Sequence, residues 1–257
     1  MNFQLPLALQ TKAKMERNRY EYVIPAHDVD GKMHFRMVAL ERALLAASGK
    51  DADRHGFGTL NLIGGEGISW VLTKFAADIK RLPVEQDKVT IETWVEGVNR
   101  LLTTRNFIMR DEAGEILCTA TTEWAIIDLK TRRPVNVIRD TNIADYATGE
   151  TVSAELPGKL PQASGDNIYR HKVVYSDIDY NGHTNSMQYV QWIMDSYPID
   201  QVYDRQVGRF EIVYSKEAVY GEDIEVCYED VADDMTLFSV RSAEGSHFVS
   251  ARIKWKS

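Results

Sequence analysis

Apolar and polar residues follow an order of strand-like and helix-like patterns that occurs twice along the chain. In the first half, residues 19–24 alternate as in a strand, and residues 35–47 place apolar side chains on one helical face and end at Gly49, a candidate C-cap. Segments rich in Val, Ile, Thr, Trp and Phe then predict antiparallel strands at 69–81, 88–97, 101–111 and 115–129.

The second half repeats this order after a stretch with little periodicity. Residues 145–167, which include Pro157 and Pro161, are predicted as a linker, and residues 168–175 as a strand. Residues 186–197 predict a helix that Thr184 or Asn185 can cap, with an apolar face of Met187, Val190, Ile193, Met194 and Tyr197. Further strands are predicted at 210–216, 223–230, 236–243 and 247–256.

A short motif supports an internal duplication. Asp-Val-Asp-Gly-Lys-Met-His at 28–34 aligns without a gap on Asp-Ile-Asp-Tyr-Asn-Gly-His at 177–183, and each copy precedes a predicted helix. We therefore predict an α+β fold of two domains, at 1–144 and 168–257, joined by the linker at 145–167. Each domain is expected to pack one long helix against a curved antiparallel sheet.

The second copy of the motif carries the most informative candidate chemistry. Asp179, Asn181 and His183 occupy alternate positions, so in extended backbone their side chains point the same way. The helix that follows directs unpaired N–H groups at the same place. Glu217, on a strand predicted beside that helix, is a candidate base; a base beside amide donors suits attack of water on a carbonyl.

The halves differ at these positions. Lys32 stands where Asn181 stands, and the segment 80–82 (Lys-Arg-Leu) is predicted to match 216–218 (Lys-Glu-Ala). We therefore predict that the second half is catalytic and that the first half shapes a pocket. Taken singly, Glu217 could be a surface ion-pair residue, His183 a cap, and Asp177 and Asn181 turn residues; the joint spacing favours a site.

Composition narrows the function further. The 257 residues are 44% hydrophobic and 26% charged, with a net charge of −8, which argues against a nucleic-acid binder. Two cysteines, Cys118 and Cys227, suit a reducing compartment, and neither a signal peptide nor a membrane-spanning run is present. We expect a cytoplasmic protein, with no metal or organic cofactor.

The pattern Asp-x-Asp-x-Asn-x-His-x-Asn at 177–185, followed by Tyr189 and Trp192, resembles that of hotdog-fold thioesterases. The wider match resembles the acyl-acyl carrier protein (acyl-ACP) thioesterases of plants and bacteria, and it covers nearly the whole chain in family order. It includes segments at 70–74, 80–83, 93–95, 114–117, and Trp124 with 131–133.

This resemblance implies a tandem double hotdog that hydrolyses the thioester between a fatty acyl chain and ACP. The family's catalytic residues map onto Asp179, Asn181, His183 and Glu217. Plant members have a cysteine where this chain has Ala218, so an active enzyme here needs no thiol at that position. The long N-terminal extension of plant members is absent, which favours a bacterial-type cytoplasmic enzyme.

We expect the thioester carbonyl to lie at the helix N-terminus, near the N–H groups of His183 and Thr184 and the amide of Asn181. Glu217, assisted by His183, is expected to take a proton from the attacking water while Asp179 orients Asn181 or the water. A covalent route, in which a carboxylate attacks first, stays open.

The acyl chain needs an apolar tunnel, which we expect between the first-half helix and sheet, formed from Val38, Leu44, Leu45, Ile63 and Trp70. Docking of an acidic carrier is expected to use some of Arg100, Arg105, Arg110, Arg132, Arg133 and Arg139. The alternatives are an acyl-CoA thioesterase, a hotdog dehydratase and a non-catalytic acyl-binding protein. A homodimer is plausible.

Overall fold

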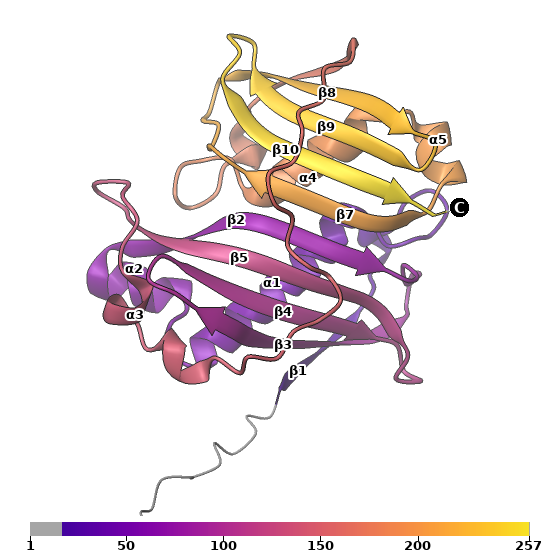
Figure 1. Cartoon of the computed structure of the whole chain (residues 1–257). Coiled ribbons are helices and arrows are strands. Elements are labelled where there is room, and N and C mark those ends of the chain that lie inside the picture. Colours follow the sequence, from indigo (N-terminus) through magenta and orange to yellow (C-terminus); the bar gives the residue numbers. More distant parts are fainter. Residues whose placement is uncertain (1–16, 257) are drawn as a thin grey trace, which may run out of the picture.

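One continuous antiparallel sheet runs through both halves of the computed structural model, which describes residues 17–256 (Figure 1). The first half contributes strands β1 (Asn18–Val23), β2 (Ile68–Ile79), β3 (Lys88–Val98), β4 (Leu102–Arg110) and β5 (Ile116–Asp128). The second half contributes β6 (Asn167–Lys172), β7 (Val207–Tyr214), β8 (Asp223–Ala232), β9 (Met235–Ser242) and β10 (His247–Trp255).

The order of the strands in space shows the duplication directly. The first half is arranged β1-β3-β4-β5-β2 and the second β7-β10-β9-β8-β6, which is the same topology read from the opposite end. The halves join where β2 pairs with β7, from Lys74 opposite Val213 to Asp78 opposite Arg209. An ion pair of 2.6 Å between Asp78 and Arg209 supports this junction.

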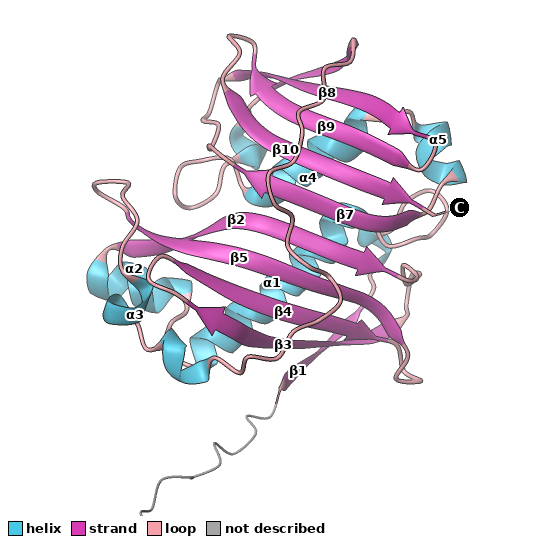
Figure 2. Cartoon of the chain, viewed as in Figure 1, coloured by secondary structure: helices cyan, strands magenta, loops and turns pink. Residues whose placement is uncertain are grey.

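The helices cover one face of the sheet (Figure 2). The long helices are α1 (Met37–Arg54) and α4 (Ser186–Ser196), which contact each other, and shorter ones are α2 (Thr59–Glu66), α3 (Val137–Asp140) and α5 (Ile199–Asp204). The 3₁₀ turns η1 (Ala26–Asp28) and η3 (Tyr175–Asp177) precede the long helices, and η2 (Ile143–Tyr146) follows α3. The predicted arrangement of one long helix against a sheet in each half is confirmed.

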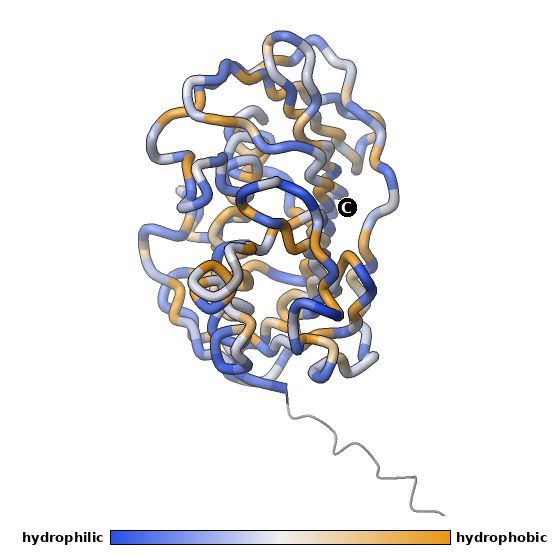
Figure 3. The backbone as a smooth tube through the Cα atoms, turned by 90° about the vertical axis from the view of Figure 1, so that its left-hand side faces the viewer, coloured by the Kyte–Doolittle hydropathy of each residue, from blue (hydrophilic) through white to orange (hydrophobic). Residues whose placement is uncertain are grey.

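A single core extends under both long helices. From α1, Leu40 and Leu44 are completely buried, and from α4, Val190 and Ile193 are too. Each such side chain contributes about 1.5–3 kcal/mol when it leaves water. Hydrophobic and hydrophilic stretches are interspersed along the coloured tube in Figure 3, and the central strands β4, β5 and β9 are buried over most of their length.

The prediction that the first helix ends at Gly49 is wrong. Helix α1 continues to Arg54 with Gly49 exposed in its interior, a position where glycine costs roughly 1 kcal/mol relative to alanine. Apolar residues beyond Gly49, such as the buried Ala52, keep the helix on the core. The glycine that ends it is Gly56, whose φ of 82° lies in the left-handed region.

The two motif loops are confirmed as structural equivalents. Asp30 N–H donates to His34 O at 2.8 Å, and Asp179 N–H donates to His183 O at 2.9 Å. In each loop the aspartate Oδ1 also accepts the backbone N–H two residues further on, at 2.8 Å. The duplication therefore extends to individual hydrogen bonds.

The predicted alignment of the two strand ends is wrong by one residue. The loop N–H just before α4 donates to Ala218 O at 3.0 Å, and the equivalent N–H before α1 donates to Pro83 O at 2.9 Å. Leu82, and not Arg81, therefore stands at the position of Glu217. The two helix-to-strand connections differ in length, so the sequence does not fix this register.

The segment at 147–166 contains no regular element and crosses the face of the sheet opposite the long helices (Figure 1). Side chains hold it to both halves, with Ser153 Oγ 2.8 Å from Thr119 Oγ1 and the N–H of Ala163 donating to Ser239 Oγ at 2.8 Å. It occupies most of the stretch predicted as the linker at 145–167. Between residues 17 and 256, no helix is long and apolar enough to cross a membrane.

Candidate active site

A tight turn presents the predicted catalytic side chains. Gly182 closes the turn with a φ of 77°, a conformation that glycine adopts without strain, and its N–H donates to Asp179 O at 3.0 Å. The carboxylate of Asp179 accepts the N–H of Asn181 through Oδ1. Asp179 therefore holds the backbone of Asn181 in place. This contact fits the first of its two expected roles, which were to orient Asn181 or the water.

Asp177 has a structural role, as expected for an aspartate in a turn. Its buried carboxylate accepts the N–H of Val174 at 2.8 Å and lies 2.8 Å from His171 Nε2. These contacts hold η3 at the end of β6 and thereby fix the start of the loop. Asp177 is thus a support for the site rather than a member of it.

Asn185 caps helix α4, and its side chain accepts the N–H of Met187 at 3.1 Å. One of the two predicted caps is therefore confirmed. Thr184, the other, is buried and uses its N–H to reach Ala218 O. That bond brings the loop against the segment that carries Glu217. His183 precedes Thr184 and Glu217 precedes Ala218, so each lies next to one end of this hydrogen bond.

The tautomer of His183 follows from the hydrogen bond that its ring makes to the backbone of the loop. Nδ1 lies 2.9 Å from the backbone oxygen of Asn181, and because a carbonyl oxygen can only accept, Nδ1 carries the proton. In the neutral ring this leaves Nε2 with a lone pair. The half-buried imidazole can therefore accept a proton or a hydrogen bond from water at Nε2.

The expected pair of oxyanion donors needs a correction. The N–H of Thr184 is already bonded to Ala218 O and does not face a substrate. The N–H of His183 differs from that of its equivalent, because His34 N–H donates to Asp30 Oδ1 at 3.0 Å. In the described chain Asp179 Oδ1 accepts only Asn181 N–H, which leaves the His183 N–H as the available donor.

Glu217 is half-buried and forms an ion pair with Arg132. Arg132 comes from the first half, in the turn after β5, and has a φ of 57° that is uncommon for a residue with a side chain. Arg132 is also one of the residues predicted for carrier docking, and no local sequence signal connects it with Glu217. The pair shows that the site draws on both halves of the chain.

A buried carboxyl lies beneath the helix N-terminus. Glu41 of α1 is 1% exposed and accepts a hydrogen bond of 3.2 Å from the hydroxyl of Tyr214, which also lies 3.3 Å from Ser186 O at the start of α4. Within the described chain its Oε2 has no hydrogen-bond partner. Burial raises the pKa of Glu41 to about 8, so the group is mostly neutral at pH 7.

A second buried hydroxyl supports the segment after Glu217. The Tyr189 hydroxyl accepts the N–H of Ala218 at 2.7 Å, and burial raises the pKa of this phenol. Its ring packs edge-on against Tyr214, with centroids 6.0 Å apart. The network of Glu41, Tyr214 and Tyr189 was missed because its members are spread over more than 170 residues.

A cavity of about 170 Å³ lies beside the site, between α1 and the first-half sheet. Leu45 and Trp70, both predicted to contact the acyl chain, line it together with Phe57 and Trp124. Tyr180, which follows Asp179 in the loop, also lines it and connects it to the site. Sequence reasoning missed Tyr180.

The other predicted acyl contacts lie elsewhere. Leu44 is completely buried in the core, and Ile63 on α2 lines neither of the two cavities. Val38 lines a separate, larger cavity near the N-terminal end of α1. Leu44 and Leu45 are adjacent on α1 and therefore point to different faces, whereas Val38 lies about two turns from Leu45 along the helix.

One predicted docking residue is wrong. Arg105 is buried and donates to Asp51 Oδ2 at 2.7 Å, so it cannot meet a carrier protein. Among the others, Arg139 is exposed but paired with Asp140 at 2.6 Å, and Arg110 contacts the buried Glu92. Arg100 and Arg133 are exposed.

No group of three or more His, Cys, Asp or Glu side chains that could hold a metal ion is found over residues 17–256. The candidate site consists of a carboxylate, an imidazole and amide donors. Together these groups can polarise a carbonyl and activate water.

Two helix-on-sheet units that share one sheet, with a polar loop of one unit facing a cavity of the other, define the double hotdog class. The chain belongs to the acyl-ACP thioesterase family. The model of the acyl-ACP thioesterase N-terminal domain matches residues 16–146, and that of the C-terminal domain matches residues 161–257.

Among solved structures, an acyl-ACP thioesterase from Bacteroides thetaiotaomicron has a TM-score of 0.86 and 30% identity, covering 93% of this chain and 97% of that one. The 12:0-ACP thioesterase from Umbellularia californica shares the fold, with a TM-score of 0.79 and 22% identity over 93% of this chain and 96% of that one.

Among curated proteins, the chloroplastic palmitoyl-acyl carrier protein thioesterase of Gossypium hirsutum is 26% identical over 221 residues. The match covers 78% of this chain and 53% of that protein. The chain thus spans about half the length of the curated relatives it matches.

Proposed function

We propose that this protein hydrolyses fatty acyl-ACP to a free fatty acid and ACP. Family membership supports the reaction class. The observation that carries the proposal is the asymmetry of the two loops. The second-half loop keeps Asn181 and is followed by Glu217, whereas the equivalent positions in the first half hold Lys32 and Leu82.

The first chemical step uses groups from the loop and from the strand end. The thioester oxygen accepts a hydrogen bond from the His183 N–H, and the carboxamide of Asn181 is a second donor. One such donor is typically worth about 10²–10³ in rate. Water attacks the carbonyl carbon while Glu217 takes its proton, and the lone pair on His183 Nε2 holds the water in line.

The second step returns that proton. The tetrahedral intermediate collapses, the carbon–sulfur bond breaks, and the leaving thiolate takes the proton from Glu217. The products are a carboxylic acid and a free thiol, so atoms and charges balance. Arg132 orients the Glu217 carboxylate before attack and must loosen its hold when that carboxylate becomes protonated.

The acyl chain lies in the cavity beside Tyr180, with Leu45 and Trp70 on its walls. Burial of each methylene there contributes about 0.8 kcal/mol. Because the cavity is built from the first half and the reacting groups come mainly from the second, both halves are needed for one active site.

A cytoplasmic location and a homodimer are also part of the proposal. Cys118 and Cys227 are both free and buried, as suits a reducing compartment. The outer strands β1 and β6 each leave one edge of the sheet unpaired in the described chain, where a second copy can pair. Sedimentation equilibrium at micromolar concentration tests the dimer.

Release of free thiol from a panel of ACP and CoA thioesters tests the function. We expect rapid turnover of carrier-bound chains by the wild-type protein and a loss of about 10²–10⁴-fold in Glu217→Gln. Glu244→Gln, on an exposed turn, is the matched control and should retain full activity. Turnover of CoA esters alone would move the protein to another substrate class, and no thiol release would leave a binding protein.

A further inference from the structure

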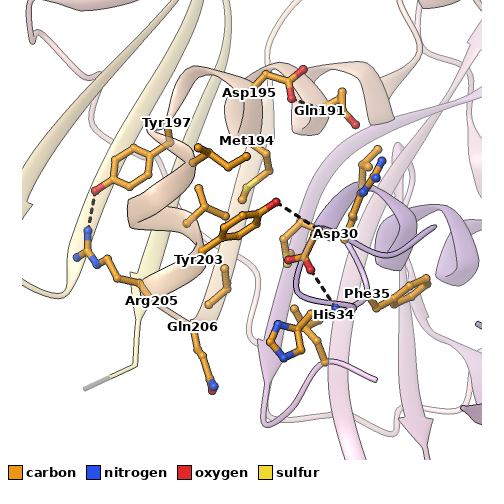
Figure 4. Close-up of a pocket in the computed structure, with 18 of the residues that line it drawn as sticks. Asp30, His34, Phe35, Gln191, Met194, Asp195, Tyr197, Tyr203, Arg205 and Gln206 are labelled. Carbon is orange, nitrogen blue, oxygen red and sulfur yellow. Dashed lines mark hydrogen bonds between the residues drawn. The ribbon is translucent and has the colours of Figure 1, made fainter. Parts of the chain in front are cut away.

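A second cavity, larger than the one beside Tyr180, lies away from the candidate active site. It has a volume of about 400 Å³, within the roughly 300–1,000 Å³ usual for small-molecule sites. The loop at 30–38 forms one wall and helices α4 and α5 form the other, with Tyr203 directed from α5 toward the loop of Asp30 (Figure 4). Apolar side chains, including Phe35, Leu82 and Met194, line much of it.

This cavity is the duplicate of the acyl cavity. Leu45, in the ninth position of α1, lines the smaller cavity, and Met194, in the ninth position of α4, lines the larger. The residues that follow the second aspartate of each loop are also equivalent. Tyr180 lines the smaller cavity and Gly31 lines the larger one. Each cavity therefore lies between the loop of one half and the helix of the other.

The duplicate cavity lacks the groups that cleave a thioester. Leu82 stands where the active half has Glu217, and Lys32 stands where it has Asn181. The N–H of His34 is bonded to Asp30 Oδ1 and is not free to hold an oxyanion. A ligand in this cavity would be bound without being hydrolysed.

Charge distinguishes this cavity from the rest of the acidic chain. Four cations line it, Arg36, Arg81, Arg205 and Lys256, against two carboxylates, Asp30 and Asp195. The chain as a whole has a net charge of −8, so this positive excess is local.

The cations differ in how strongly they are engaged. Arg81 pairs with Asp111 at 3.1 Å, and Arg205 donates to the Tyr197 hydroxyl at 2.6 Å. Arg36 is exposed and lies near Asp195, whose pKa is raised by burial and lowered by the charge of Arg36. Burial lowers the pKa of Lys256, so an anion nearby would stabilise its charged form.

We propose that this cavity binds a fatty carboxylate as a non-catalytic site, with the alkyl chain along Phe35, Met194 and Val202 and the carboxylate at Arg36. An apolar wall with a positive rim matches an alkyl chain with an anionic head. The site goes beyond the proposed hydrolysis, since binding here requires no step of that reaction.

Methionine positions allow a direct test. Met37 and Met194 line the larger cavity, and no methionine lines the smaller one. In protein carrying ¹³C-methyl methionine, titration with decanoate should shift the methyl signals of Met37 and Met194 saturably. The buried Met109 and the half-buried Met235, which line neither cavity, should not move. Met37→Leu and Met194→Leu assign the two signals.

The head group is tested with a neutral ligand and a matched pair of variants. Decanol has the same chain without the charge and should bind at least about tenfold more weakly. Arg36→Glu should weaken decanoate binding about tenfold, a change of roughly 1.4 kcal/mol. Lys159→Glu makes the same charge change on the exposed linker and should leave it unchanged.

The result that overturns the proposal is equally specific. Decanoate that leaves Met37 and Met194 unmoved up to millimolar concentration, or that occupies only the smaller cavity, contradicts it. So does equal binding of decanoate and decanol in wild type and Arg36→Glu. The titration is repeated on Glu217→Gln, so loss of hydrolysis and loss of this binding are distinguished.

Discussion

Replacing Glu41 by Gln should change how stability depends on pH. The carboxyl is 1% exposed, its Oε1 accepts from Tyr214, and burial raises its pKa from 4.5 to about 8. Gln keeps the shape and the acceptor oxygen but does not titrate. The substitution therefore isolates the proton on this one side chain.

The sign follows from proton binding in the two states. Between about pH 4.5 and 8 the folded protein holds a proton on Glu41 that the unfolded chain has released, so the free energy of unfolding falls as pH rises. Below pH 4.5 Glu41 is protonated in both states, and its burial has no pH-dependent cost. Each pH unit above 4.5 lowers the free energy of unfolding by about 1.4 kcal/mol, which gives roughly 3 kcal/mol by pH 7.

Urea denaturation between pH 5 and 8 measures this difference. The free energy of unfolding of Glu41→Gln minus that of wild type should rise by about 1.4 kcal/mol per pH unit up to pH 7 and level off near pH 8. Other groups titrate alike in both proteins and cancel. Glu244→Gln should show no such slope. A Glu41→Gln difference independent of pH would refute the assignment of a neutral carboxyl.

Two further predictions concern the site and its cavity. Arg132→Ala should lower kcat by about ten- to a hundredfold with little change in KM, because Glu217 loses the guanidinium that orients it. Lys130→Ala, which removes an exposed cation from the same turn, should be neutral in steady-state kinetics on acyl-ACP. Leu45→Phe should shift the preferred substrate to shorter acyl chains, because each methylene that is excluded from the cavity loses about 0.8 kcal/mol of binding free energy. The equivalent change in the other cavity, Met194→Phe, should leave the preference unchanged. A panel of acyl-ACP chain lengths measures this, and an unchanged preference in Leu45→Phe would contradict the position of the acyl chain.

The repeated elements could be predicted from the sequence because their signals are local. Strands β5 and β10 are runs of strand-favouring residues that are buried over most of their length, and the helices α1 and α4 carry apolar residues at helical spacing. The short helices α2 and α5 were missed, since Leu60 is 81% exposed and Ile199 is 66% exposed, so neither shows a clear apolar face.

The candidate site was predictable only in part. The loop residues lie within five positions of one another, so their convergence follows from spacing. Arg132, Glu41 and Tyr180 contribute through contacts across the two halves, which no local pattern reports. Similarly, the equivalence of Leu82 and Glu217 in the two halves depends on backbone hydrogen bonds at the strand ends.

The central claim is that one of the two equivalent loops hydrolyses acyl-ACP and the other does not. His183 and His34 occupy the same position in these loops, so His183→Ala and His34→Ala form a matched pair. We predict that kcat/KM for acyl-ACP falls about 10²-fold or more in His183→Ala and stays within twofold of wild type in His34→Ala. Equal losses in both variants, or a loss only in His34→Ala, would contradict the account.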